Sequence, residues 1–194
     1  MKLAPLDLTR TALVLIDLQR GIVGLPVAPH AGAAVVANAA KIADRFRAAQ
    51  ATVVLVNVAF SADGRDVLKL DVDEPTRRGE LPPNWAEIVP ELGPKPHDIL
   101  ITKRHWAPSA APSSTCNCAA AGVNRIVLGG IATNFGVEST ARAAHELGYH
   151  QIFVEDATTS LSAEAHAFTV RHIFPRLGQV RSTQDVLEAC GAAS

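Results

Sequence analysis

Two ionisable side chains of opposite charge stand at the ends of two strongly apolar segments. Asp17 closes the run TALVLID, and Lys103 directly follows the run DILIT. Burial raises the pKa of a carboxylic acid and a neighbouring cation lowers it, so its surroundings can tune a carboxylate at a strand end. The two residues are either the acid–base centre of a catalytic site or an ordinary ion pair, and position alone favours neither.

A third segment offers backbone donors to a ligand. GGIATNFGVESTARAAHELGY, residues 129–149, has the pattern of a strand, a turn and a helix. The first turn of a helix presents N–H groups at the positive end of the helix dipole, which suits a carbonyl oxygen or an oxyanion. Gly136 lies in this turn, where its missing side chain leaves room for a ligand. Alternatively, the glycines of this segment serve only helix–sheet packing.

Apolar runs that predict strands alternate along the chain with segments of helical periodicity. The two strongest, TALVLID and ATVVLVNVAF, are almost wholly apolar, as in strands buried on both faces. The predicted strands are residues 11–17, 51–60, 98–102, 125–132, 151–156 and 178–182. The predicted helices are residues 33–49, 137–147, 163–173 and 183–189.

This alternation predicts an α/β fold in one domain, residues 1–194. We expect a three-layer αβα sandwich with a six-stranded, mostly parallel, Rossmann-like sheet. Ligands of such sheets bind beyond the carboxyl ends of the strands, which is where Asp17, Lys103 and the glycine turn would lie. The proline-rich residues 71–96 predict an irregular excursion over one edge.

Composition excludes several classes of function. The 194 residues are 48% hydrophobic and carry a net charge of −1, which gives no general attraction to nucleic acid or to an anionic membrane. No apolar run reaches the roughly 18–20 residues that span a bilayer, and the N-terminal MKLAPLDLTR does not resemble a signal peptide. Three cysteines suit a reducing compartment, so we expect a cytoplasmic protein.

We expect no cofactor and no metal. The glycine turn does not have the G-x-G-x-x-G spacing of a dinucleotide site, and the chain has no P-loop, which argues against a dinucleotide-dependent enzyme. The seven histidines show no ligand spacing; His166 and His172, for example, are poorly placed for one helix face.

Together, TALVLIDLQRGI, ILITKRHW, the segment 129–149 and VEDATTS resemble the isochorismatase-like hydrolase superfamily over nearly the whole chain. The resemblance implies that Asp17 and Lys103 are catalytic residues and that Gly136 lies in the nucleophile turn. It also implies a non-proline cis peptide bond between Ile131 and Ala132. The metal set that nicotinamidases of this superfamily carry after the second strand is missing, because NVAFSADGRD has no histidine.

The chain departs from most of the superfamily at Gly136, where a cysteine nucleophile is usual. Glycine closes the covalent acyl-enzyme route at this position. The sequence resembles a subgroup without this cysteine, and true isochorismatases also carry glycine there and use the aspartate as the general acid. We therefore expect a small-molecule hydrolase in which Asp17 acts as general acid or base and Lys103 tunes its charge. The alternative is a non-catalytic descendant that binds a metabolite.

Several residues near the predicted strand ends are candidates for holding the substrate. The N–H groups of Ala132 and Gly136 are candidate donors to a substrate oxygen. The other candidate substrate contacts are Asn134, Phe135, Trp106 and Phe60. Family members usually self-associate, so the resemblance also implies a homo-oligomer, a dimer or a tetramer.

Residues 107–121, APSAAPSSTCNCAAA, do not fit the resemblance, which predicts a G-A-F-x-G-T loop followed by an amphipathic helix. This segment can be encoded by codons that give a different product when one base is added in front of them. The shifted frame reads GAFGGTELDLQLRRR, which has the same length and fits the resemblance. We hypothesise a frame slip of one base over these residues. The alternative is a divergent, alanine-rich helix. In either case Cys116 and Cys118 support no metal or redox role.

Overall fold

The computed structural model describes residues 2–74, 81–106 and 122–191. The hypothesis of a frame slip over residues 107–121 lies outside these ranges. No helix in the described ranges has the length and apolar character that crossing a membrane requires.

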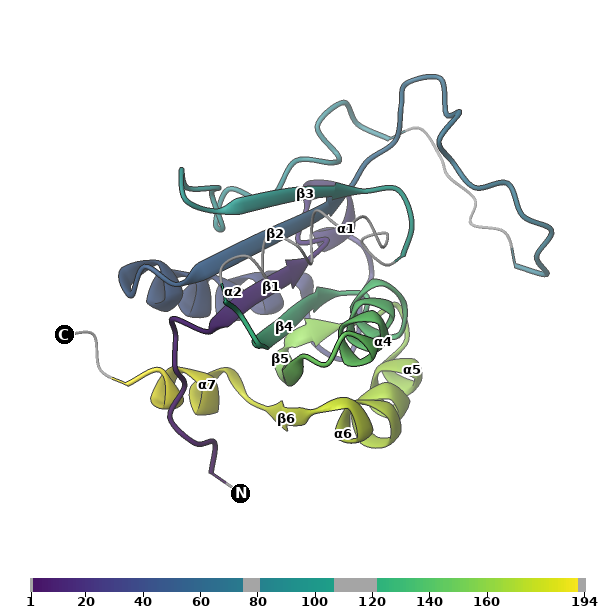
Figure 1. Cartoon of the computed structure of the whole chain (residues 1–194). Coiled ribbons are helices and arrows are strands. Elements are labelled where there is room, and N and C mark those ends of the chain that lie inside the picture. Colours follow the sequence, from purple (N-terminus) through teal and green to yellow (C-terminus); the bar gives the residue numbers. More distant parts are fainter. Residues whose placement is uncertain (1, 75–80, 107–121, 192–194) are drawn as a thin grey trace.

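Six parallel strands form one sheet in the order β3-β2-β1-β4-β5-β6 (Figure 1). All five pairings of neighbouring strands are parallel, and this confirms the predicted fold class. Because β1 has β2 on one side and β4 on the other, its carboxyl end lies at the centre of the sheet edge. The strands are β1 Thr11–Ile16, β2 Thr52–Val58, β3 Ile99–Lys103, β4 Arg125–Ile131, β5 His150–Thr159 and β6 Gln179–Arg181.

Helices cover both faces of the sheet (Figure 1). All six residues of β1 are buried, and its apolar side chains alternate between two cores. Leu13 and Leu15 pack in the core that includes α2 (Gly32–Ala48) and α7 (Thr183–Ala189). Val14 and Ile16 pack in the core that includes α4 (Glu138–Glu146) and the first residue of α6 (Phe174–Leu177). A strand with two apolar faces is therefore the residue pattern that this three-layer arrangement requires.

The helical segments largely follow the prediction. They are α1 Arg20–Val23, α2 Gly32–Ala48, η1 Thr133–Val137, α4 Glu138–Glu146, α5 Ala163–Phe168, η2 Thr169–Ile173, α6 Phe174–Leu177 and α7 Thr183–Ala189. The predicted helix 163–173 instead runs on to Leu177 through the π-helical η2. Pro175 does not end it, because this proline lies in the first turn of α6, where a backbone N–H is not needed.

The connection between β2 and β3 extends away from the sheet (Figure 1). As predicted for residues 71–96, its described part contains no helix or strand. One isolated bridge, between Gln19 and Ile88, ties it to the segment that follows β1. The connection thus passes close to the carboxyl end of the central strand.

Gly130 allows β4 to approach the end of β1. Its φ of +129° is one that L side chains rarely adopt, and a Cβ atom here would lie 2.1 Å from the Ile16 carbonyl oxygen. That oxygen belongs to rigid strand backbone, so it cannot move aside cheaply. The absence of a side chain at Gly130 therefore sets how closely the turn after β4 lies to Asp17.

We expect Gly130→Ala to lower the free energy of unfolding by about 2–4 kcal/mol, through backbone strain and a clash with Ile16. Urea denaturation followed by circular dichroism measures this change. Gly24→Ala is the control, because Gly24 has an ordinary φ of −79° and its nearest atom would be 3.8 Å away. Equal stability of the two variants would contradict the close approach.

Candidate active site

Asp17 and Lys103 form a buried ion pair at the carboxyl edge of the sheet. The Nζ atom of Lys103 lies 2.7 Å from Oδ2 of Asp17, and their side chains are 3% and 7% exposed. Strand β2 lies between β1 and β3, and neighbouring strands are about 4.8 Å apart, so the lysine side chain must reach across β2. A long, flexible cation is the residue type that this distance requires.

The backbone of Asp17 turns sharply at the end of β1. Its φ is +54°, in the left-handed region where aspartate and asparagine are several-fold enriched over other side chains. Its N–H still donates to the Val56 carbonyl at 2.8 Å, so the ladder with β2 continues to this residue. The residue is thus held by the sheet while its conformation leaves the strand.

The environment of the Asp17 carboxyl favours its protonated form. Burial raises the pKa of Asp17 to about 6, although the charge of Lys103 and its hydrogen bond act in the opposite direction. Oδ1 of Asp17 is buried and has no hydrogen-bond partner within the described part of the chain. An acid with a pKa near neutrality and an unused oxygen has the properties of a group that exchanges a proton with a ligand.

The turn after β4 brings Gly136 next to the ion pair. The peptide bond between Ile131 and Ala132 is cis, at the position that the resemblance implies. A Cβ atom at Gly136 would lie 3.3 Å from Oδ2 of Asp17 and 3.5 Å from Nζ of Lys103. The closest contact would be with Cγ2 of Ile16, at 3.1 Å, so only a small group fits. The three predicted catalytic residues therefore converge.

The turn uses part of its own hydrogen-bonding capacity. The N–H groups of Phe135 and Val137 both donate to the Ala132 carbonyl, at 3.1 and 3.2 Å. The Gly136 carbonyl accepts a 2.6 Å hydrogen bond from Oγ1 of Thr140 in α4. Asn134 accepts through its side-chain oxygen from Ser160, which follows β5. These contacts fix the turn to α4 and to the end of β5.

The predicted aromatic residues fall into two groups. Trp106 meets Phe135, the residue before Gly136, edge to face, with ring centroids 4.9 Å apart. Phe60 instead stacks on Trp85, with centroids 6.0 Å apart. Trp106 is 62% exposed, so most of its surface is available to a ligand or to another part of the protein.

Gln19 supports the site and escaped the sequence reasoning. It is fully buried, and its amide nitrogen donates to the carbonyls of Val58 and Trp85 at 3.0 and 3.2 Å. Its amide oxygen accepts from the Val58 N–H at 2.8 Å. The side chain thus joins the end of β2 to the β2–β3 connection. The sequence feature that could have indicated this role is the position of a polar amide directly after the segment LVLIDL.

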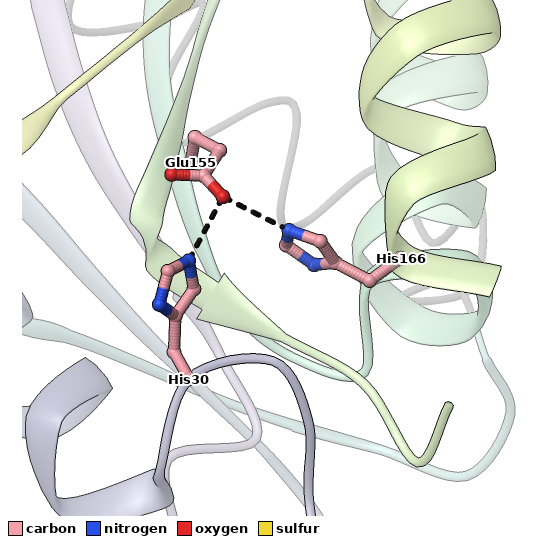
Figure 2. Close-up of side chains that lie close together, drawn as sticks. All are labelled: His30, Glu155 and His166. Atoms are coloured by element: carbon pink, nitrogen blue, oxygen red, sulfur yellow. Dashed lines mark hydrogen bonds and ion pairs between the residues drawn. The ribbon is translucent and has the colours of Figure 1, made fainter. Parts of the chain in front are cut away.

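His30, Glu155 and His166 also lie together, against the expectation from histidine spacing (Figure 2). Their ligand-type atoms are all within 4.8 Å of one another, although the residues come from distant parts of the sequence. His166 reaches the active-site turn, because its Nδ1 is 2.8 Å from Oγ1 of Thr133. No local spacing could have revealed a cluster that only the tertiary fold assembles.

The ion pair makes a prediction about stability. We expect Lys103→Met to lower the free energy of unfolding by about 2–3 kcal/mol at pH 7.5, because Asp17 must then stay buried as an unpaired charge or take up a proton. The double variant Asp17→Asn/Lys103→Met should recover most of this loss, since replacing both charges of a buried pair is often nearly neutral. Chemical denaturation of the single and double variants measures both effects. This account would be contradicted if the double variant lost as much free energy of unfolding as Asp17→Asn and Lys103→Met lose when their separate effects are added.

The same pair predicts a dependence on pH. The pKa of Asp17 in the folded chain, about 6, exceeds the ordinary value of 3.8, so the folded state holds this proton more tightly than the unfolded state. Its contribution to stability should therefore be lost as the pH rises from about 4 to about 6. In Asp17→Asn that contribution should disappear from the pH profile of unfolding.

Comparison with known proteins identifies the chain's relatives. The isochorismatase domain model matches residues 11–185. An uncharacterised isochorismatase family protein of Bacillus subtilis, YwoC, is 47% identical over 94% of this chain and 95% of its own. Ureidoacrylate amidohydrolase RutB of Rhizobium rhizogenes is 30% identical over 91% of this chain and 82% of its own.

A solved structure agrees with these matches. An isochorismatase family protein from Burkholderia thailandensis superposes with a TM-score of 0.91, at 40% identity, over 97% of this chain and 99% of that one. The sheet order, the parallel pairings and the extent of the sequence matches all lead to the same assignment. The chain belongs to the isochorismatase family.

Proposed function

We propose that the chain is a small-molecule hydrolase that works without a cysteine nucleophile, with Gly136 at the position where most of the superfamily has that cysteine. The observation that carries the proposal is the buried Asp17–Lys103 pair, 2.7 Å apart, with Gly136 next to both side chains. An ordinary surface ion pair is exposed and weakly coupled, whereas this acid and this cation are buried beside a glycine. Catalysis then rests on proton transfer and electrostatic stabilisation.

Asp17 is the proton carrier in this proposal. With a pKa of about 6, it is available near neutral pH in both the protonated and the ionised form. As an acid it would protonate the terminal carbon of a vinyl ether; water then adds to the cationic carbon, and the adduct releases an alcohol and a ketone. As a base it would take a proton from the water that attacks an amide carbonyl, and the amine leaves after protonation.

Lys103 and the turn would supply the remaining interactions. Lys103 keeps the ionised form of Asp17 accessible in spite of burial, and its Nζ also donates to the His105 carbonyl at 3.2 Å. The N–H groups of Ala132 and Gly136 would hold a substrate oxygen, because those of Phe135 and Val137 already donate to the Ala132 carbonyl. The remaining substrate contacts in this proposal are Asn134, Phe135, Trp106 and Phe60.

The decisive experiment is a hydrolysis assay with isochorismate, ureidoacrylate, nicotinamide and an N-carbamoyl amino acid. We expect the wild type to turn over at least one of them and Asp17→Asn to lower kcat/KM at least about 100-fold, the usual contribution of an acid or base. Asp98→Asn is a matched control, because Asp98 is also buried and ion-paired, to Arg47 at 2.6 Å, but outside the site. Activities are compared per folded molecule.

Equal turnover by the wild type and Asp17→Asn would overturn the enzymatic proposal. Binding of a compound without turnover would instead favour the metabolite-binding alternative. Under the enzymatic proposal, the pH profile of kcat/KM has a limb with a pKa near 6. A limb that falls with rising pH assigns Asp17 as acid, and one that rises assigns it as base. A flat profile between pH 5 and 8 would contradict either role.

A second variant tests the space beside Gly136. We expect Gly136→Ala to lower kcat/KM at least about tenfold while the free energy of unfolding changes by no more than about 1–2 kcal/mol. The new methyl group would contact Asp17 and Lys103 at 3.3 and 3.5 Å and occupy room that a substrate needs. Steady-state kinetics together with urea denaturation separate the two effects. Unchanged kinetics would show that no substrate approaches this position.

We further propose that the single domain, residues 1–194, self-associates as a dimer or tetramer in the cytoplasm. Self-association is supported by apolar side chains that are exposed along the β2–β3 connection, namely Leu68, Leu70 and Val72. Exposed apolar clusters of this kind often mark surfaces that contact another chain.

A further inference from the structure

A cluster of metal-ligand side chains lies next to the active-site turn but takes no part in the proposed reaction. Oε1 of Glu155 lies within hydrogen-bonding distance of two imidazoles (Figure 2). It is 2.8 Å from Nε2 of His30 and 3.2 Å from Nε2 of His166. Figure 2 shows both rings directed at the same carboxylate oxygen. Two Nε2 atoms and a carboxylate oxygen thus share one small volume.

The fold holds each of the three residues from a different element. Glu155 lies in β5, and His166 lies in α5, whose first turn is capped by the Ser162 side chain. His30 precedes α2, and its segment is fixed to the sheet by the bridge between Ala28 and Ser160, with N–O distances of 2.7 and 3.1 Å. The cluster is therefore formed by well-anchored backbone on all three sides.

The geometry is close to that of a divalent metal site. Ligand atoms about 2.0–2.2 Å from a metal in tetrahedral arrangement are separated by roughly 3.3–3.5 Å. The two separations from Oε1 of Glu155, 2.8 and 3.2 Å, need only small side-chain adjustments to reach that value. The side chains of His30 and Glu155 are 31% and 36% exposed, so an ion can enter and can keep a water ligand.

A further contact resembles the outer shell of known metal sites. The second nitrogen of His166, Nδ1, is hydrogen-bonded to Oγ1 of Thr133 at 2.8 Å, and both residues are buried. Metal-ligating histidines almost always make a hydrogen bond with their other ring nitrogen, and such a contact fixes the ring orientation. The contact holds the ring so that Nε2 of His166 faces Oε1 of Glu155.

We propose that His30, Glu155 and His166 form a site for a divalent transition-metal cation of the zinc type. Two imidazoles and one carboxylate are the donor set that such cations prefer over magnesium or calcium. The site is separate from Asp17 and Lys103, so the proposal does not depend on the proposed function. Bound metal would link α5, β5 and the segment before α2 beside Thr133 of the active-site turn.

The protonation states of the cluster agree with this site. Burial lowers the pKa of His166, and this outweighs the opposite effect of Glu155, so the neutral imidazole prevails at neutral pH. Burial acts to raise the pKa of Glu155, but the hydrogen bonds with His30 and His166 outweigh it and hold this pKa below the usual value. A neutral imidazole and an ionised carboxylate are the forms that bind metal.

Zinc binding to the full-length chain, without a polyhistidine tag and freed of metal by a chelator, tests the proposal. Isothermal titration with Zn²⁺ should show one equivalent bound per chain, and affinity should fall at least about tenfold in His30→Ala and in Glu155→Gln. Both changed side chains are partly exposed, so these variants should fold. His145→Ala is the matched control, because His145 is an exposed histidine outside the cluster.

Two further readouts address the same site. Co²⁺ should give the visible absorption of a low-coordinate site in the wild type and in His145→Ala, and not in the two cluster variants. Zn²⁺ should also raise the Tm of the first two proteins only, since a ligand that binds the folded state stabilises it. The proposal is overturned if the wild type binds zinc no more tightly than His30→Ala and Glu155→Gln, whether all of them bind or none does.

Discussion

The arrangement of this molecule depends on one buried ion pair that spans three strands. Removing two charges from water is costly, and the Asp17–Lys103 attraction compensates only if both atoms are held in close register. The sheet order provides that register, because β2 lies between the two strands and the lysine side chain crosses it. The turn that carries Gly136 approaches this pair from the side of β4. The raised pKa of Asp17 follows from the same burial that makes the pair expensive.

Much of this arrangement was readable from the sequence, because the information is local. A strand buried on both faces of a parallel sheet must be a continuous apolar run, and a polar residue that ends such a run must lie at the sheet edge. For this reason the sequence predicts the six strands and the position of Asp17 and Lys103 at the carboxyl edge of the sheet. The helix after residue 163 extends further than predicted, since a proline ends a helix only where its missing N–H matters, and the first turn of α6 has no such need. The π-helical turns, η1 and η2, left no mark in the apolar periodicity that indicates helices.

The side chains that escaped prediction are those whose role depends on distant partners. Gln19 gives no periodic signal, yet it satisfies three backbone groups from two other segments. His30 and Glu155 stand 125 positions apart and meet only because β5 passes beside the segment that precedes α2. Single-sequence reasoning weighs neighbours along the chain, whereas hydrogen bonds and ligand sets are decided by neighbours in space. The partners of buried polar residues are therefore the contacts that are hardest to predict from a single sequence.

The hydrogen bond between Thr133 and His166 links the active-site turn to the cluster of His30, Glu155 and His166. Thr133 directly follows Ala132, and its hydroxyl group is held by an imidazole that belongs to a different helix and a different polar cluster. Loss of either partner leaves a buried polar atom of the other without this hydrogen bond, which costs about 1–3 kcal/mol, so we expect the two positions to change together. Laboratory redesign of the turn for new compounds meets the same constraint, and libraries that vary both positions together explore sequences that libraries of single changes never reach.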